Sequence, residues 1–119
     1  MKDFRALKVW QKSHQTTLNV YRVTQLFPRD ELYGLTSQTR RASTSIAANI
    51  AEGCGRGTDA DFARFLQIAM GSASELENHL LLAFDLGFLE ASGHQARAAD
   101  VTEVKRMLTA FIQKLKAES

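Results

Sequence analysis

The sequence predicts an all-α protein, an antiparallel up-down-up-down four-helix bundle that forms a single domain over residues 1–119. Apolar residues recur at helical spacings of three and four in four long segments, and no segment shows the alternation of a strand. One proline and seven glycines leave long stretches between helix breakers. The connections between the segments are short, which favours antiparallel neighbours. At 119 residues the chain has room for one domain and one core.

The first two helices are predicted from their apolar sides and their end signals. The first runs from about Leu7 to Leu26 and ends before Pro28, because proline disfavours helix in the residue before it. Its apolar residues cover a wide arc: Val9, Trp10, Val20, Tyr21 and Val23. The second runs from about Leu35 to Glu52, and Gly53 suits the left-handed position after a helix end. It carries few large side chains, so neighbouring helices can approach it closely. Its apolar side consists of Leu35, Ala42, Ile46 and Ile50.

The third and fourth helices carry heptad-like apolar seams. Thr58 or Asp59 can cap the third helix, and Gly87 marks its end. Its seam is Phe62, Leu66, Ala69, Ala73, Leu76, Leu80 and Ala83. Ser92 and Gln95 form a predicted capping box before the fourth helix, which runs from about Gln95 to Lys116. The seam of the fourth helix is Val101, Val104, Leu108, Phe111 and Leu115.

The helices are expected to be about 20 residues each, which predicts a bundle about 30 Å long. Some apolar residues do not fit a lone bundle of this kind. Leu81 and Leu82 fall outside the third helix's seam, and the apolar arc of the first helix is wider than one contact needs. Surplus apolar surface predicts a subunit interface. The alternative interpretation is isolated surface leucines, which are common.

Catalytic and metal-binding patterns are not recognised in the chain. The histidines are His14, His79 and His94, and the spacing of Glu75 and His79 predicts a local hydrogen bond, since di-iron bundles use Glu-x-x-His twice. Cys54 is expected in a glycine loop without an activating histidine. The GCGRG loop lacks the Gly-Lys-Ser/Thr ending of a phosphate-binding loop. We therefore expect no catalytic residue, metal or cofactor.

Composition suggests a cytoplasmic protein. A single cysteine excludes an internal disulfide framework, and there is no secretory apolar segment or run of transmembrane length. The net charge is only +2, but residues 1–64 carry ten Lys/Arg against six Asp/Glu, and the rest carries five against seven. Overall charge therefore indicates no particular partner.

A polar set on the second and third helices has two interpretations. Its members are Gln38, Arg41, Asn49, Glu52 and Glu75. The structural interpretation is a hydrogen-bonded network near the bundle interior or a subunit contact, with Glu75 as a partner for Arg41. Arg41 and Glu52 lie about 16 Å apart along one helix, so they cannot pair within it. The functional interpretation is a ligand pocket.

A basic stripe follows the first helix and the residues before it. Arg5, Lys8, Lys12 and Arg22 lie on one side, with no acidic residue among them in the sequence. The stripe is either a solvated face or a surface that contacts nucleic-acid phosphates. No aromatic residue interleaves with it, so base stacking is not supported.

Three segments resemble a known family. They are Phe-Pro-x-x-Glu-x-Tyr-Gly-Leu-x-x-Gln over 27–38, Arg-Ala-x-x-Ser-Ile-x-x-Asn-Ile-x-Glu-Gly over 41–53, and Phe-Leu-x-x-Ala-x-Gly-Ser-x-x-Glu-Leu over 65–76. The chain resembles bacterial four-helix-bundle proteins first noticed as products of intervening sequences in large-subunit ribosomal RNA genes. The resemblance implies an antiparallel bundle and a ring-like homopentamer. Related retroelement accessory proteins bind nucleic acid and a reverse transcriptase.

Together, these observations predict a non-enzymatic oligomeric assembly or adaptor protein. Its expected partners are its own copies and either RNA or DNA, bound through the basic stripe. The alternatives are a structural oligomer that binds only a protein partner, and then an enzyme with an unrecognised site.

Overall fold

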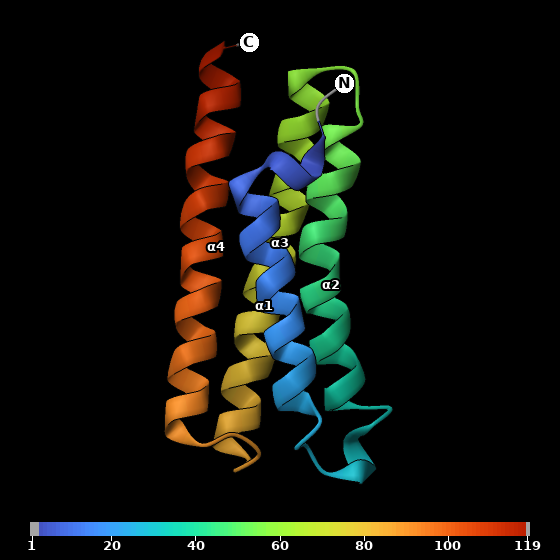
Figure 1. Ribbon diagram of the computed structural model, residues 1–119, viewed down its shortest axis with the longest axis vertical. Helices are drawn as coiled ribbons and strands as arrows, with labels where there is room; N and C mark the ends of the chain where they lie inside the picture. The colour runs from blue at the N-terminus through green and yellow to red at the C-terminus, as the bar shows by residue number, and fades with distance from the viewer. Residues whose placement is uncertain (1–2, 119) are drawn as a thin grey trace.

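The computed structural model describes residues 3–118, which form four α-helices in an antiparallel bundle (Figure 1). The elements are η1 (Phe4–Ala6), α1 (Lys8–Thr24), η2 (Arg29–Glu31), α2 (Leu35–Cys54), α3 (Asp59–Asp85) and α4 (Ala91–Glu118), where η marks a short 3₁₀ helix. Each helix packs against two others, in the cyclic order α1, α2, α3, α4. The contacts of α3 with α2 and α4 are more extensive than those of α1. The predicted fold class is confirmed.

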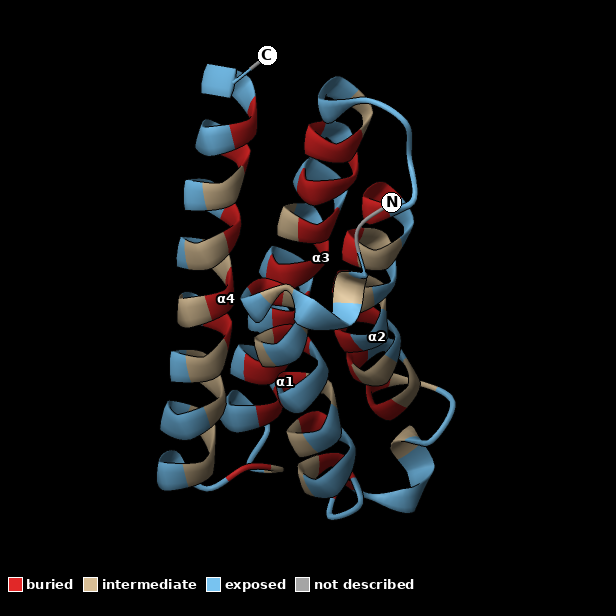
Figure 2. Ribbon diagram, turned by 45° about the horizontal axis from the view of Figure 1, so that its top comes forward, coloured by how far each residue is buried: buried red, intermediate tan, exposed pale blue. Residues whose placement is uncertain are grey.

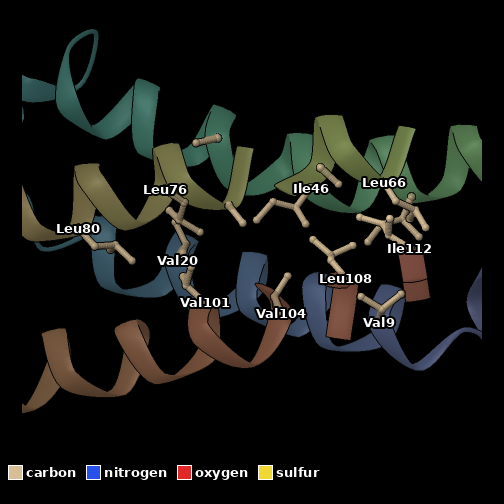
Figure 3. Close-up of a cluster of buried hydrophobic side chains, with 14 of the residues drawn as sticks. Val9, Val20, Ile46, Leu66, Leu76, Leu80, Val101, Val104, Leu108 and Ile112 are labelled. Carbon is tan, nitrogen blue, oxygen red and sulfur yellow. The ribbon is translucent and has the colours of Figure 1, made fainter. Parts of the chain in front are cut away.

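The core is a column of aliphatic side chains contributed by all four helices (Figure 3). Every residue of the predicted α3 seam is buried. The four predicted apolar residues of α2 are buried as well. On α4, Ile112 is buried, whereas the predicted Phe111 is half-buried and packs edge-on against Phe62, with ring centroids 5.1 Å apart. Figure 2 shows the buried sides of the helices turned toward one another.

Hydroxyl side chains complete the inner side of α1, which is a feature that apolar periodicity alone did not predict. Ser13, Thr16 and Thr24 are buried. Each donates its hydroxyl to the carbonyl four residues back, at 2.7–2.8 Å. Because their polar groups are satisfied within the helix, these residues can occupy core positions. Conversely, Tyr21 is 41% exposed, so the apolar arc of α1 extends beyond its buried side.

Two predicted helix ends are confirmed. The Thr58 side chain accepts a hydrogen bond from the Asp61 N–H at 3.1 Å and caps α3. At the other end Gly87 has a φ of 83°, and the N–H groups of Gly87 and Phe88 donate to the carbonyls of Phe84 and Ala83. This is a Schellman ending, and it requires a left-handed residue that glycine adopts without strain.

The predictions for Gly53 and Ser92 are wrong. Gly53 lies inside α2, where an added Cβ would come within 2.8 Å of the Phe65 Cβ. It is therefore a site of close helix approach, and Cys54, expected in a loop, is buried in the last turn of α2. Ser92 lies inside α4, which begins at Ala91. The first hydrogen bond of this helix runs from the His94 N–H to the Glu90 carbonyl.

The predicted length of about 30 Å is also wrong, because α3 and α4 contain 27 and 28 residues and the longest dimension is 46 Å. Helix α1 contains only 17 residues, so it covers part of the length of α4 (Figure 1). Among residues 3–118, no helix has both the length and the apolar character needed to cross a membrane.

Candidate assembly surface and basic face

The polar set of α2 and α3 lies at the surface of the single chain. Gln38, Arg41, Glu52 and Glu75 are exposed, and Asn49 is half-buried. The interior placement of the expected network is therefore wrong for these residues, because their positions on the helices turn away from the core. Placement at a contact between subunits stays a prediction.

The members of the polar set have local partners or none within the described chain. Glu52 pairs with Arg56 at 2.9 Å, four residues later and just beyond the end of α2. Glu75 lies 3.4 Å from the Nε2 of His79, as its spacing predicted, and does not pair with Arg41. Within residues 3–118 the side chains of Gln38 and Arg41 make no hydrogen bond or ion pair, so both are available to another molecule.

A smaller polar connection joins α2 to α3, and it includes residues that sequence reasoning missed. The hydroxyls of Ser45 and buried Ser72 lie 2.8 Å apart. Asn49 donates from Nδ2 to the Ser45 carbonyl at 2.8 Å and to its hydroxyl at 3.0 Å. The sequence signal for this connection is Ser72, the serine of the Ala-x-Gly-Ser segment of the third helix, together with the serines of the second helix.

Large apolar side chains are exposed near one end of the bundle. Tyr33 is 93% exposed, Leu32 is 48% exposed and Tyr21 is 41% exposed. These three residues line a surface groove of about 400 Å³ together with Arg41 and other residues of the N-terminal half of α2. Arg40 also lines the groove and links α2 to α1: its guanidinium lies 4.7 Å from the Tyr21 ring centroid and donates to Thr24 Oγ1 at 2.8 Å. We name Tyr21, Leu32, Tyr33 and Arg41 the tyrosine surface.

The predicted basic stripe is partly neutralised in the folded chain. Arg5 pairs with Asp3 at 3.0 Å. The side-chain hydrogen bond between Arg5 and Asp3 lowers the pKa of the Asp3 carboxyl and raises the pKa of the Arg5 guanidinium. Arg22 donates to Asn19 Oδ1 at 3.1 Å and has no acidic partner among the described residues.

Lys12 is drawn into an ion pair with α4. Its Nζ lies 2.9 Å from Asp100 Oδ1, and Arg97 donates to the other oxygen at 3.1 Å. Burial raises the pKa of Asp100, but the hydrogen bonds from Lys12 and Arg97 outweigh burial, so that the pKa lies below its ordinary value. An acidic residue of α4 therefore pairs with Lys12, although the stripe contains no acidic residue in the sequence. Lys8 is exposed and has no ion pair among residues 3–118.

The histidines take local structural positions. His14 stacks on Trp10 and His94 on Phe84, each with ring centroids 4.7 Å apart. Within the described residues no group of three His, Cys, Asp or Glu side chains is arranged to hold a metal ion.

Comparison with known proteins identifies the family. No curated protein matches the chain. A crystal structure of a protein of unknown function from the S23 ribosomal protein family of Bacteroides thetaiotaomicron is similar to it, with a TM-score of 0.82 and 26% sequence identity. The alignment covers 88% of this chain and 95% of that one. The family model described as 23S rRNA-intervening sequence protein matches residues 5–110. Since this match spans most of the sequence, the chain belongs to the 23S rRNA-intervening sequence protein family.

Proposed function

We propose that this protein is a non-enzymatic assembly protein of the cytoplasm, whose chains associate with one another and present a binding surface to a partner. The observation that carries the proposal is the tyrosine surface. Tyr33 is 93% exposed, and its ring gains a large apolar contact area only when another molecule covers it. The number of copies, five, comes from the family resemblance.

The sequence of α2 supports contact between copies at this surface. Half-buried Ser37 and exposed Thr44 line the same groove, and exposed Ala48 follows Thr44 one helical turn later. Small side chains of this kind leave room for a neighbouring subunit to approach closely. Arg41, which has no partner within the described chain, would find one across such a contact, in agreement with the prediction of a polar network between subunits.

Multi-angle light scattering at micromolar concentrations tests the proposal. The native protein should have several times the chain mass of 13.2 kDa. Tyr33→Ser should lower the assembled mass without lowering helical content, because the ring contributes little to the single chain. Tyr33→Phe is the matched control and should keep the native mass. A native protein that is monomeric throughout this range would refute self-association.

Phosphate contact through α1 is the second candidate function, and one observation favours it. The helix carries Lys8, Lys12 and Arg22 and contains no acidic residue, and five further Lys/Arg against three acids lie on α4, which packs beside it. A closed ring would repeat this face in every subunit and strengthen a weak field.

A gel shift at about 50 mM salt tests phosphate contact, because such binding is strongest at low salt. Lys8→Glu with Arg22→Glu should weaken the binding of all RNA or DNA sequences about equally. Lys12 is left unchanged, because its reversal would place a carboxylate against Asp100. Arg29→Glu with Arg64→Glu makes the same change in net charge elsewhere and serves as the control. Equal shifts for both pairs of variants would leave α1 as a solvated face and favour a protein partner.

A further inference from the structure

A second groove lies between the beginning of α1 and the C-terminal half of α4. It has a volume of about 360 Å³. Its apolar floor is formed by Leu7, Val9, Met107, Ala110 and Phe111. Its charged rim is formed by Lys8, Arg106 and Lys114. We name this site the α1–α4 groove; it does not include any residue of the tyrosine surface.

The groove exists because α1 is shorter than the helix beside it. Helix α1 begins at Lys8, whereas α4 continues to Glu118 (Figure 1). The segment before α1 turns toward α2, since η1 contacts α1 and α2 but not α4. One position of the four-helix arrangement is therefore only partly filled at this end, and the inner side of α4 is left with half-buried Met107 and Phe111.

The charges around the groove select the occupant. Lys8 and Lys114 have no ion pair among residues 3–118. Arg106 donates from Nε and Nη2 to both carboxylate oxygens of Glu103, and its side chain remains 69% exposed. A nucleic-acid backbone would satisfy the cations but gain nothing from an apolar floor. An acidic segment with apolar side chains satisfies both.

The spacing of the cations fits a helix. Arg106 and Lys114 are eight residues apart on α4, which corresponds to about 12 Å along the axis, or slightly more than two helical turns. Carboxylates seven or eight residues apart on a helix lying along α4 would meet both cations. Apolar side chains three and four residues after the first carboxylate would point into the floor between them.

We propose that the α1–α4 groove binds an acidic amphipathic helix of another protein, which completes the partly filled position of the bundle beside α4. Apolar anchors of the partner pack on Met107 and Phe111, and its carboxylates pair with Lys8, Arg106 and Lys114. The inference extends the proposed assembly role by naming a class of partner, and it uses a surface separate from the proposed contact between copies.

A synthetic peptide tests this proposal on the full chain. The probe is a fluorescein-labelled helical peptide of about 18 residues, with glutamates seven residues apart and leucines between them at helical spacing. Its control is a scrambled peptide of identical composition, which has the same charge but no apolar face. The native protein should bind the ordered peptide about tenfold or more tightly than the scrambled one.

Variants of the groove provide the second arm. Ala110→Glu places a carboxylate on the floor and should weaken peptide binding about tenfold or more, because it fills the groove and repels the probe. Ala99→Glu introduces the same change at another exposed alanine of α4 and should bind like the native protein. In spectra of ¹³C-labelled methionine methyls, the signal of Met107 should shift on titration, whereas that of Met70 on α3 should not.

Several results would overturn the proposal. They are equal binding of the ordered and scrambled peptides, equal binding by Ala110→Glu and Ala99→Glu, and a Met107 signal that stays in place. Displacement of the peptide by RNA at equal concentration would assign the groove to nucleic acid instead. The mass of each sample, measured in parallel, separates the two proposals. A reduced mass in Ala110→Glu would mean that the groove is covered by a second copy, whereas loss of peptide binding at native mass supports a foreign helix.

Discussion

Replacing Gly53 with alanine adds a methyl group at the closest approach between α2 and α3. The new Cβ would lie 2.8 Å from the Phe65 Cβ, 2.9 Å from Phe62 Cδ1 and 3.3 Å from the Phe62 carbonyl oxygen. The Phe65 Cβ is fixed to its backbone and cannot rotate away. The two helices must therefore separate locally to accommodate the methyl group.

The expected magnitude follows from two opposing terms. Overpacking of a tight contact costs about 1–3 kcal/mol of folding free energy. Alanine in place of a helical glycine returns at most about 1 kcal/mol, and less at the end of a helix. The first term wins, so we expect Gly53→Ala to lower the free energy of unfolding by about 1–2 kcal/mol.

Gly71→Ala supplies the matched control with the opposite sign. Gly71 lies inside α3, is exposed, and has no atom within 4 Å of an added Cβ. Only the propensity term operates there, and we expect a gain of about 0.5–1 kcal/mol. Urea unfolding followed by circular dichroism measures both variants at one protein concentration, after light scattering has shown unchanged mass. A Gly53→Ala protein that unfolds at the same urea concentration as the native protein, or higher, would refute the close packing of α2 on α3.

Three further predictions concern other contacts. Asp100→Asn should lower the free energy of unfolding at pH 7 by about 1–3 kcal/mol, because Lys12 and Arg97 lose a charged acceptor. Folding lowers the pKa of Asp100, so the carboxylate stabilises the fold above the ordinary pKa of 3.8, and this stabilisation is lost as the pH falls through the folded pKa. The difference between native and Asp100→Asn protein in urea unfolding should therefore vanish in acid. Thr58→Ala should cost about 1 kcal/mol in the same assay, because the Asp61 N–H loses its capping acceptor, whereas replacing the exposed Thr102 of α4 with alanine should cost less. Arg41→Ala should leave the unfolding of a monomeric sample within about 0.5 kcal/mol of the native value and alter only the assembled mass; a large loss of monomer stability would mean that Arg41 has a partner within the chain.

The fold could be predicted from the sequence because the apolar seams of α3 and α4 are long and regular. Leu66, Leu76 and Leu80 recur at spacings that only a helix places on one side, and all three are buried. The ends were harder to predict. Glycine is typical of a helix terminus, but at Gly53 the contact with Phe62 and Phe65 determines the residue instead. A preference for a local conformation cannot reveal a contact between helices that lie apart in the sequence.

The candidate site was less predictable, for the same physical reason. The pairing of Lys12 with Asp100 joins residues 88 positions apart, so analysis of the first helix alone treated the lysine as unpaired. Gln38 and Asn49 were expected near the bundle interior or a subunit contact, but Gln38 is exposed and Asn49 is half-buried, because a small rotation of the helix decides between burial and exposure. The exposed Tyr33 lies in a connection, where periodicity gives no information about direction.

The unequal packing of the four helices also determines which helix separates first from the bundle. Helices α2 and α3 are joined by a short connection and share the most extensive contact, whereas α1 is the shortest helix and makes the smaller contacts. Partial opening therefore starts most readily with α1, leaving a three-helix unit of α2, α3 and α4. Backbone amides of α2 and α3 should then exchange with deuterium more slowly than those of α1. Because neighbouring helices along the chain make most of the contacts, the α2–α3 hairpin can form first and fold rapidly, with α1 docking last.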